Sequence, residues 1–340
     1  MGRRDPARGS SVLEKKHVPD PARSSGESPD QGLEGQQWAI QRRIEDVFAK
    51  LGEKFGDLTG RVEVKVRPDT SFSHIGGLQE AKLAIRGFVT ALTDPELYKQ
   101  WGITPPKGVL IYGPPGTGKS LLARALATEA GAIFYHLKLM NLTSKFGPNT
   151  GELIQEILGV AKEQGRSVVF LDEADALSLE HLLPGGQARE ASARLVAALC
   201  EKLDGLEPFS RLVVVAATNR TDSVDPSLVG PGRLDRLVEV TLPDGPAQQE
   251  ILELTRTQAE GAAGRRLVAD LDYGSVLPPM GGMSGAEIAE VLRRALEAKV
   301  HAAGQGRDPG LVTTQDLLQQ IDAYRRIRAV VEKIRYGQYL

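Results

Sequence analysis

The stretch Gly113-Pro-Pro-Gly-Thr-Gly-Lys-Ser120 decides the fold of this 340-residue chain. It fits the pattern G-x-x-x-x-G-K-[ST] of a phosphate-binding loop at every fixed position. The apolar residues 108–112 before it are predicted to form a buried strand, and residues 121–130 after it a helix. This strand–loop–helix context is the one that the pattern requires.

Each residue type in this loop has a physical reason. The glycines let the backbone curl so that its N–H groups face a phosphate, and the N-terminus of the following helix adds a favourable dipole. Lys119 supplies positive charge to the β- and γ-phosphates, and the Ser120 hydroxyl reaches Mg²⁺. The sequence therefore predicts an ATP and Mg²⁺ site, with these binding residues: Gly113, Pro114, Pro115, Gly116, Thr117, Gly118, Lys119, Ser120 and Leu121.

Polar side chains follow two further apolar segments. In Val168-Val-Phe-Leu-Asp-Glu-Ala-Asp175, four apolar residues form a buried strand, and the carboxylates of Asp172 and Glu173 emerge at its end, where ligands of open α/β sheets lie. We expect Asp172 to hold Mg²⁺, directly or through water, and Glu173 to orient and deprotonate the attacking water. Asn219 follows the segment 212–217 and could contact the γ-phosphate or that water, although taken alone it would be interpreted as a strand cap.

The apolar segments 108–112, 133–137, 168–171 and 212–217 are typical of a parallel sheet covered on both faces. After Pro246 only helical periodicity remains, over residues 247–260, 285–303 and 314–335. The predicted fold class is therefore α/β, a P-loop NTPase parallel sheet sandwiched by helices and followed by a small all-helical lid. The expected boundaries are 71–244 for the α/β domain, 245–333 for the lid and 334–340 for a C-terminal tail.

The N-terminal residues 1–36 hold four prolines and few apolar side chains, so we expect them to be disordered. Residues 37–70 are predicted to hold an amphipathic helix and a linker. The helix carries an apolar stripe at spacings of three and four: Ile40, Ile44, Val47, Leu51, Phe55 and Leu58. Its length leaves two interpretations open, a helix packed on its own domain and a short coiled coil or partner-binding helix.

Composition excludes some classes of protein. The net charge of −2 gives no bulk attraction to nucleic acid or to an anionic membrane. The single cysteine, Cys200, cannot form an internal disulfide, and no apolar run is long enough to span a membrane. We therefore expect a cytoplasmic protein with no nucleic-acid partner and no membrane partner.

Taken together, the motifs resemble the AAA family of ring-forming ATPases over roughly residues 70 to 325. The further segments that carry the resemblance are Phe72-Ser-His-Ile-Gly-Gly-Leu78, Pro105-Pro-Lys-Gly-Val-Leu-Ile-Tyr-Gly113, Leu203-Asp-Gly-Leu206, Ala216-Ala-Thr-Asn219, Asp225-Pro-Ser-Leu228, Pro231-Gly-Arg-Leu-Asp-Arg236 and Gly282-Met-Ser-Gly-Ala-Glu287. The resemblance implies a hexamer with ATP at subunit interfaces and Asn219 as the sensor. It also implies adenine near Ile75, Gly76, Gly77, Gly285 and Ala286.

Two segments depart from the family pattern. The family usually has Arg-Pro-Gly-Arg, whose arginines reach a neighbour's γ-phosphate, whereas this chain has Gly230-Pro-Gly-Arg233. Either Arg233 acts alone, or hydrolysis is slow or needs help from elsewhere. The pore segment, commonly Lys, aromatic, aliphatic and Gly, is here Lys145-Phe-Gly-Pro148. The Phe146 ring could grip unfolded polypeptide in the channel, or it packs under its own loop.

The chain ends in Ile334-Arg-Tyr-Gly-Gln-Tyr-Leu340, which looks like the tail by which proteasomal ATPases dock into the 20S core. Its last four residues resemble the ending of the bacterial, Pup-linked proteasomal ATPases. Gln338, Tyr339 and Leu340 would supply an aromatic anchor and a terminal carboxylate, while a frayed helix end is the alternative. Those bacterial proteins carry a long coiled coil and barrel domains ahead of the motor, which are not expected here.

The sequence thus predicts an ATP hydrolase. The favoured function is a hexameric unfoldase that threads protein substrates, including Pup-tagged ones, into a 20S proteasome core. A remodelling or disassembly chaperone that acts without a protease is one alternative. A nucleotide-switched scaffold that turns ATP over slowly, because the first arginine is absent, is the other.

Overall fold

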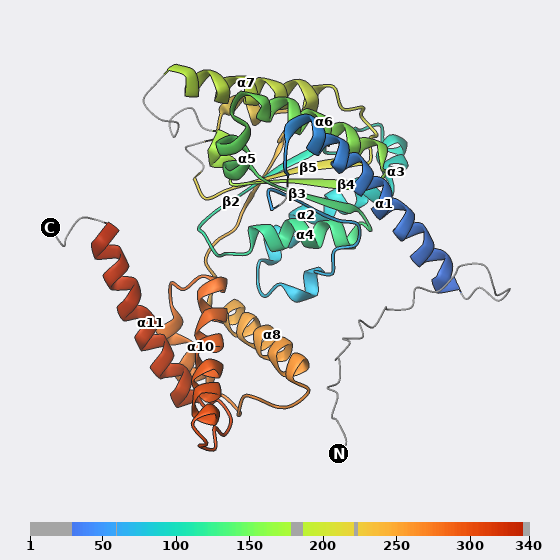
Figure 1. The fold of residues 1–340 in the computed structure, drawn as a ribbon. Coiled ribbons are helices and arrows are strands. Elements are labelled where there is room, and N and C mark those ends of the chain that lie inside the picture. The colour runs from blue at the N-terminus through green and yellow to red at the C-terminus, as the bar shows by residue number, and fades with distance from the viewer. Residues whose placement is uncertain (1–28, 59, 178–185, 221–223, 336–340) are drawn as a thin grey trace, which may run out of the picture.

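The computed structural model describes residues 29–58, 60–177, 186–220 and 224–335. They form an α/β domain around one six-stranded sheet and a smaller group of helices that follows it in the chain (Figure 1). The predicted fold class is confirmed. Within the described residues, no helix is both long and apolar enough to cross a membrane.

The sheet has the strand order β1-β3-β4-β5-β2-β6. The four predicted strands form its centre: β2 (Gly108–Tyr112), β3 (Ile133–Lys138), β4 (Ser167–Asp172) and β5 (Leu212–Thr218). They run parallel to one another and are almost wholly buried, as their continuous apolar sequences predict.

Two edge strands were not predicted, β1 (Val62–Lys65) and β6 (Arg236–Glu239). Each has only four residues and is partly exposed, so neither carries a long apolar run. The sheet departs from the predicted parallel arrangement at one edge, where β1 runs antiparallel to β3. The sheet is therefore mixed, with β1 lying opposite the residues of β3 that approach the site.

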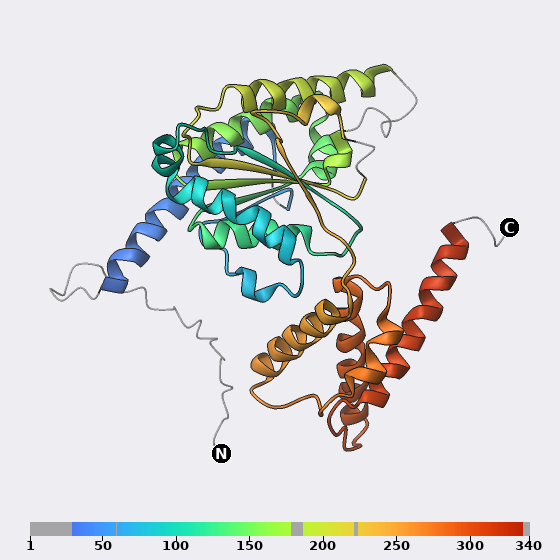
Figure 2. The ribbon, with the colours of Figure 1, turned by 180° about the vertical axis from the view of Figure 1, so that it is seen from behind.

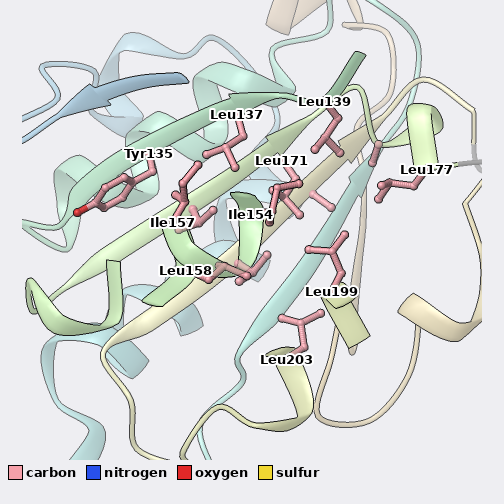
Figure 3. Close-up of a cluster of buried hydrophobic side chains, with 14 of the residues drawn as sticks. Tyr135, Leu137, Leu139, Ile154, Ile157, Leu158, Leu171, Leu177, Leu199 and Leu203 are labelled. Atoms are coloured by element: carbon pink, nitrogen blue, oxygen red, sulfur yellow. The ribbon is translucent and has the colours of Figure 1, made fainter. Parts of the chain in front are cut away.

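Helices cover both faces of the sheet (Figures 1 and 2). One face packs against α5 (Leu139–Phe146), α6 (Thr150–Glu163) and α7 (Gly186–Asp204), and the other against α2 (Gln79–Thr93) and α4 (Lys119–Glu129). Figure 3 shows the first of these two cores, where side chains of β3 and β4 meet leucines and isoleucines of α6 and α7. Each fully buried leucine contributes about 1.5–3 kcal/mol. The shorter elements are η1 (Phe72–His74), α3 (Pro95–Gln100), η2 (Gly147–Asn149), η3 (Ala174–Leu177) and η5 (Pro226–Leu228).

Helix α1 (Pro29–Phe55) begins before residue 37, where the amphipathic helix was expected to start. Ile44 and Leu51 on its apolar stripe are buried in the first core. Near the end of α1, Lys54 Nζ lies 2.7 Å from Glu152 Oε1 and 3.0 Å from Glu156 Oε1, both on α6. The stripe therefore packs on its own domain, as the first interpretation held; residues 1–28 lie outside the described residues.

The lid consists of α8 (Gly245–Ala263), α9 (Tyr273–Val276), η6 (Pro278–Met280), α10 (Gly285–Gly304) and α11 (Thr314–Arg335). The Asp244 side chain accepts a hydrogen bond from the Ala247 N–H at 3.0 Å and so caps α8 where the chain leaves the α/β domain. The lid has its own apolar core, which includes Leu252, Leu292 and Ile321. From this domain the N-terminus of α10 contacts the loop after β2.

Candidate active site

Glycines fix the shape of the loop between β2 and α4. Gly113 has a φ of 149° and Gly116 a φ of 75°, backbone conformations that residues other than glycine rarely adopt. A Cβ atom would lie 1.9 Å from the Val240 carbonyl oxygen at Gly113, and 2.8 Å from Ser284 Oγ at Gly116. The loop ends at the N-terminus of α4, whose first backbone N–H groups have no helical acceptor and suit an anion.

Lys119 lies at the start of α4 with only 8% of its surface exposed. Its Nζ atom donates to the carbonyl oxygens of Gly113 at 2.9 Å and of Pro114 at 2.7 Å. Burial lowers the pKa of this amine from its ordinary value, while the carboxylates of Asp172 and Asp175 act in the opposite direction. The loop therefore surrounds a cationic side chain with backbone, as phosphate binding requires.

Asp172 ends β4 beside the loop. Its Oδ2 atom accepts from Ser120 Oγ at 3.3 Å and from His136 Nε2 at 3.0 Å, and its Oδ1 atom accepts from the Glu173 N–H at 3.0 Å. Burial raises the pKa of Asp172, but these hydrogen bonds, that of His136 foremost, outweigh it and leave the pKa below the ordinary value. The site thus holds an ionised carboxylate next to a hydroxyl.

Glu173 follows in a left-handed backbone conformation, with a φ of 58°. This conformation is uncommon outside glycine and costs of the order of 1–3 kcal/mol, so the surrounding structure must hold it. Its side chain is exposed. Partial loss of solvent, followed by the nearby carboxylates of Asp172 and Asp175, raises the pKa of Glu173. A raised pKa makes this carboxylate a better proton acceptor than its neighbour.

A cavity of about 770 Å³ joins these residues. Its volume lies within the range of small-ligand sites. Most of the predicted site residues line it: Ile75, Gly76, Pro115, Gly116, Thr117, Gly118, Lys119, Ser120, Leu121, Asp172, Glu173, Asn219, Gly285 and Ala286. Three of the predicted ATP-binding residues do not. Gly77 lines a neighbouring cavity of about 450 Å³, while Gly113 and Pro114 contribute carbonyl oxygens to Lys119.

Helix α8 supplies lining residues that the sequence analysis missed. Ile251, Leu254 and Gln258 face the cavity together with Thr255. They recur at spacings of three and four, so the stripe was visible in the sequence, although not the surface that it would meet. The apolar side chains of Ile251 and Leu254, with Ile75, form a wall suited to a flat ring such as a nucleobase.

The segment at residues 75–77 is held from both domains. Lys82 of α2 is buried and donates to the Ile75 carbonyl oxygen. Glu250 of α8 accepts from the Gly77 N–H at 2.7 Å. A Cβ atom on Gly76 would lie 2.6 Å from Ile251 Cγ1. This close approach requires glycine and brings the lid against the cavity.

The N-terminus of α10 touches the loop directly. Ser284 and Glu287 form a capping box, with Glu287 Oε2 accepting from the Ser284 N–H at 2.6 Å. The Ala286 N–H donates to the Gly116 carbonyl oxygen at 3.0 Å. A change in the loop therefore reaches the lid through one backbone hydrogen bond and one cap.

Glu287 also contacts α11. Its Oε1 atom lies 3.5 Å from Tyr324 OH and 3.5 Å from Arg328 Nη1. Arg328 Nη1 donates as well to the Gly282 carbonyl oxygen at 3.1 Å. One carboxylate is thus shared between the cap of α10 and the last helix.

Arg233 lies away from this cavity. Its Nε and Nη2 atoms each donate to one oxygen of Asp204 at 2.7 Å, and Nη1 contacts the Ser227 carbonyl oxygen and Cys200 Sγ. The hydrogen bond to Asp204 raises the pKa of Arg233, so the guanidinium is cationic. These partners are not among the described residues that line the nucleotide cavity of the same chain.

The predicted pore residues end α5. Phe146 is half-buried and packs against the first core, while the exposed Lys145 has its Nζ atom 5.3 Å from the centre of that ring. This packing matches the second interpretation of Phe146 for the single chain. The predicted docking residues Gln338, Tyr339 and Leu340 lie outside the described residues.

Comparisons with known proteins agree with this site. The family model described as "ATPase family associated with various cellular activities (AAA)" matches residues 109–242. The chain is 34% identical over 300 residues to the proteasome-activating nucleotidase of Saccharolobus solfataricus, covering 87% of this chain and 73% of that protein. It is 38% identical over 263 residues to the proteasome-activating nucleotidase of Methanopyrus kandleri, covering 77% and 58%.

These relatives are archaeal, whereas the tail suggested bacterial proteasomal ATPases; that finer resemblance stays a prediction. Residues of the loop, the acidic pair and the lid line one cavity. The cavity and the relatives point to the same nucleotide chemistry. The chain belongs to the AAA family of ATPases, is a homologue of the archaeal proteasome-activating nucleotidases, and is an ATP hydrolase.

Proposed function

We propose that the cavity binds ATP together with Mg²⁺ and that its residues act in hydrolysis as the sequence predicted. Mg²⁺ prefers oxygen ligands and keeps several waters, and the 3.3 Å contact between Ser120 Oγ and Asp172 Oδ2 offers two such ligands side by side. When bound, Mg²⁺ would neutralise charge on the phosphates. Ser120 and Asp172 are the residues that would hold it.

The remaining groups fit defined roles in phosphoryl transfer. Lys119 would exchange its carbonyl partners for the β- and γ-phosphates. Glu173, whose pKa is raised, would orient the attacking water and accept its proton. Asn219 lines the same cavity from the end of β5, where its amide would contact the γ-phosphate or that water.

We further propose that the chain forms a hexameric ring that unfolds and translocates protein substrates and activates a 20S proteasome core. The observation that carries this is the 34% identity over 87% of the chain to a proteasome-activating nucleotidase. Arg233 would serve the γ-phosphate of a neighbouring subunit. Its place outside its own cavity and its cationic state support that role.

The test is to mix the purified protein, ATP and Mg²⁺ with a 20S core from the same cell and to follow cleavage of a fluorogenic peptide. We expect stimulation that is lost when Tyr339 and Leu340 are deleted, because these residues would form the docking tail. The deletion variant should keep its ATPase activity, which serves as the control. Stimulation that survives the deletion would count against docking through the tail, and no stimulation by the intact protein would favour a chaperone that acts without a protease.

A slow-turnover scaffold remains the second candidate because Gly230 stands where the family has its first arginine, and Arg233 is bound to Asp204. Steady-state ATPase assays separate the two. A working motor should turn over faster than both its Glu173→Gln and Arg233→Ala variants. Equal rates for all three proteins would favour the scaffold.

Phe146 tests the threading step. If the Phe146 side chain leaves the core in the assembled hexamer and contacts substrate, Phe146→Ala should stop unfolding of a tagged fluorescent protein while ATP binding persists. Asn141→Ala, at an exposed position of the same helix that is not a predicted pore residue, is the matched control for a general disturbance of α5. If the Phe146→Ala variant still unfolds the substrate, the Phe146 side chain serves only to pack against the core.

A further inference from the structure

A buried histidine lies directly behind the acidic pair. His136 is only 7% exposed, and its Nε2 atom is 3.0 Å from Asp172 Oδ2. An ionised carboxylate can only accept, so the imidazole nitrogen is the donor. A buried polar ring is costly unless it is hydrogen-bonded, and this bond to Asp172 offsets that cost.

The sheet register creates this contact. His136 lies opposite Phe170 in the β3–β4 pair, and Asp172 is two residues further along β4, so the two side chains point to the same face. The imidazole ring packs against Phe170, with ring centres 5.1 Å apart, and against Phe134 at 6.0 Å. Two aromatic rings therefore restrict the orientation in which Nε2 meets the carboxylate.

Asp172 needs an anchor that does not itself bind the metal. Ser120 also donates to Oδ2, but Ser120 is a proposed ligand and its hydroxyl is needed elsewhere. An imidazole is a poor ligand for Mg²⁺, which prefers oxygen, so the bond from His136 can persist while Asp172 acts on the metal. Such outer partners of ligating carboxylates govern how well the ligand is oriented.

We propose that His136 is a positioning residue that holds the Asp172 carboxylate in the orientation needed for the Mg²⁺–nucleotide complex. The unpredicted strand β1 completes the arrangement, because Glu63 pairs with His136 across the β1–β3 ladder. Glu63 Oε2 lies 3.6 Å from His136 Nδ1, too far for a good hydrogen bond, and its side chain is 45% exposed. Its contribution is therefore small beside that of His136.

The inference rests on the nucleotide site proposed above and not on proteasome activation. Its test is equilibrium binding of a fluorescent, non-hydrolysable ATP analogue as Mg²⁺ is varied. His136→Leu removes the donor, and we expect the half-saturating Mg²⁺ concentration to rise roughly 10- to 100-fold. Binding of the analogue in EDTA should stay as in the wild type, because the loop and Lys119 are intact.

Two further variants separate positioning from packing. His136→Gln places an amide N–H near the position of Nε2 and should bring the half-saturating Mg²⁺ concentration most of the way back to the wild-type value. Tyr135→Phe changes a buried residue of the same strand that belongs to the opposite core, and it should behave as the wild type. Thermal unfolding checks that each variant is folded; should His136→Leu fail, His136→Asn, whose side chain is too short to reach Oδ2, takes its place.

Three results would overturn the inference. The first is a half-saturating Mg²⁺ concentration in His136→Leu equal to that of the wild type. The second is an equal rise of that concentration in His136→Gln and His136→Leu, which would indicate that only packing of the imidazole ring matters. The third is a wild-type protein whose binding does not depend on Mg²⁺, which would refute the metal site itself. The first two leave the metal site standing, so the two failures can be told apart.

Discussion

Replacing Gly116 by alanine should force the lid away from the phosphate-binding loop. The new Cβ atom would lie 2.8 Å from Ser284 Oγ and 3.0 Å from Ala286 Cβ. The serine hydroxyl can rotate away, although it then leaves the cap of α10, which costs about 0.5–2 kcal/mol. Ala286 Cβ has no such freedom, so the N-terminus of α10 has to move as a whole.

Gly282 provides a matched control because it has nearly the same backbone conformation, with φ of 79° against 75° at Gly116. A Cβ atom at Gly282 would meet no described heavy atom within 4 Å. Alanine in a left-handed conformation costs about 1–2 kcal/mol at either site. Overpacking adds about 1–3 kcal/mol at Gly116 alone. The free energies of unfolding of the two variants should therefore differ by about 1–3 kcal/mol.

The measurement is urea unfolding of the two variants without nucleotide. Their midpoint urea concentrations are compared, provided that the slope of the unfolding free energy against urea concentration is the same. If the apo lid swings aside to relieve the overlap, the strain returns when ATP closes it, and affinity for ATP should fall instead by roughly 5- to 150-fold. Gly116→Ala and Gly282→Ala variants that match in both stability and ATP affinity would refute the close contact between loop and lid.

Glu173→Gln should retain ATP binding and lose hydrolysis by roughly 10²- to 10⁴-fold, as measured by phosphate release, since an amide cannot accept the proton of the water; turnover near the wild-type rate would exclude Glu173 as the base. Arg233→Ala should lower turnover by roughly 10³-fold or more if it acts on a neighbour's γ-phosphate. Asp204→Asn, which removes the negative charge beside Arg233, should shift turnover without altering ATP affinity; unchanged turnover would show that this ion pair has no part in hydrolysis. Arg293 and Arg294 hold the pKa of Glu290 at about 2, below its ordinary 4.5. The contribution of these ion pairs to the stability of the folded protein is therefore present above pH 4.5 and is lost as the pH falls towards 2. Glu290→Gln should therefore reduce stability at pH 7 by less than about 1 kcal/mol, and the difference should vanish near pH 2; a difference independent of pH would refute the ion pairs as its source.

The sequence was sufficient for features that depend on local pattern. The four central strands are buried on both faces, so their apolar runs were easy to recognise. The loop after β2 and the carboxylates after β4 follow fixed spacings, and the parallel strands bring them to the same edge of the sheet.

Features that depend on distant partners could not be predicted. Strand β1 is short and half exposed, and only its pairing with β3 defines it. The wall of the cavity formed by Ile251 and Leu254 comes from a helix more than one hundred residues after the loop. His136 is one of five histidines scattered along the chain, and its contact with Asp172 arises from a sheet register that no local pattern contains.

The carboxylate of Glu287 has a consequence for the far end of the chain. Beyond Arg328, α11 continues for seven residues to Arg335, a length of about 10 Å at 1.5 Å per residue. Val330 and Val331 in this stretch are exposed, so the direction of these final turns is set where Tyr324 and Arg328 meet Glu287. A tilt of α10 as ATP arrives would thus swing the last turns of α11, up to Arg335, in step with the lid.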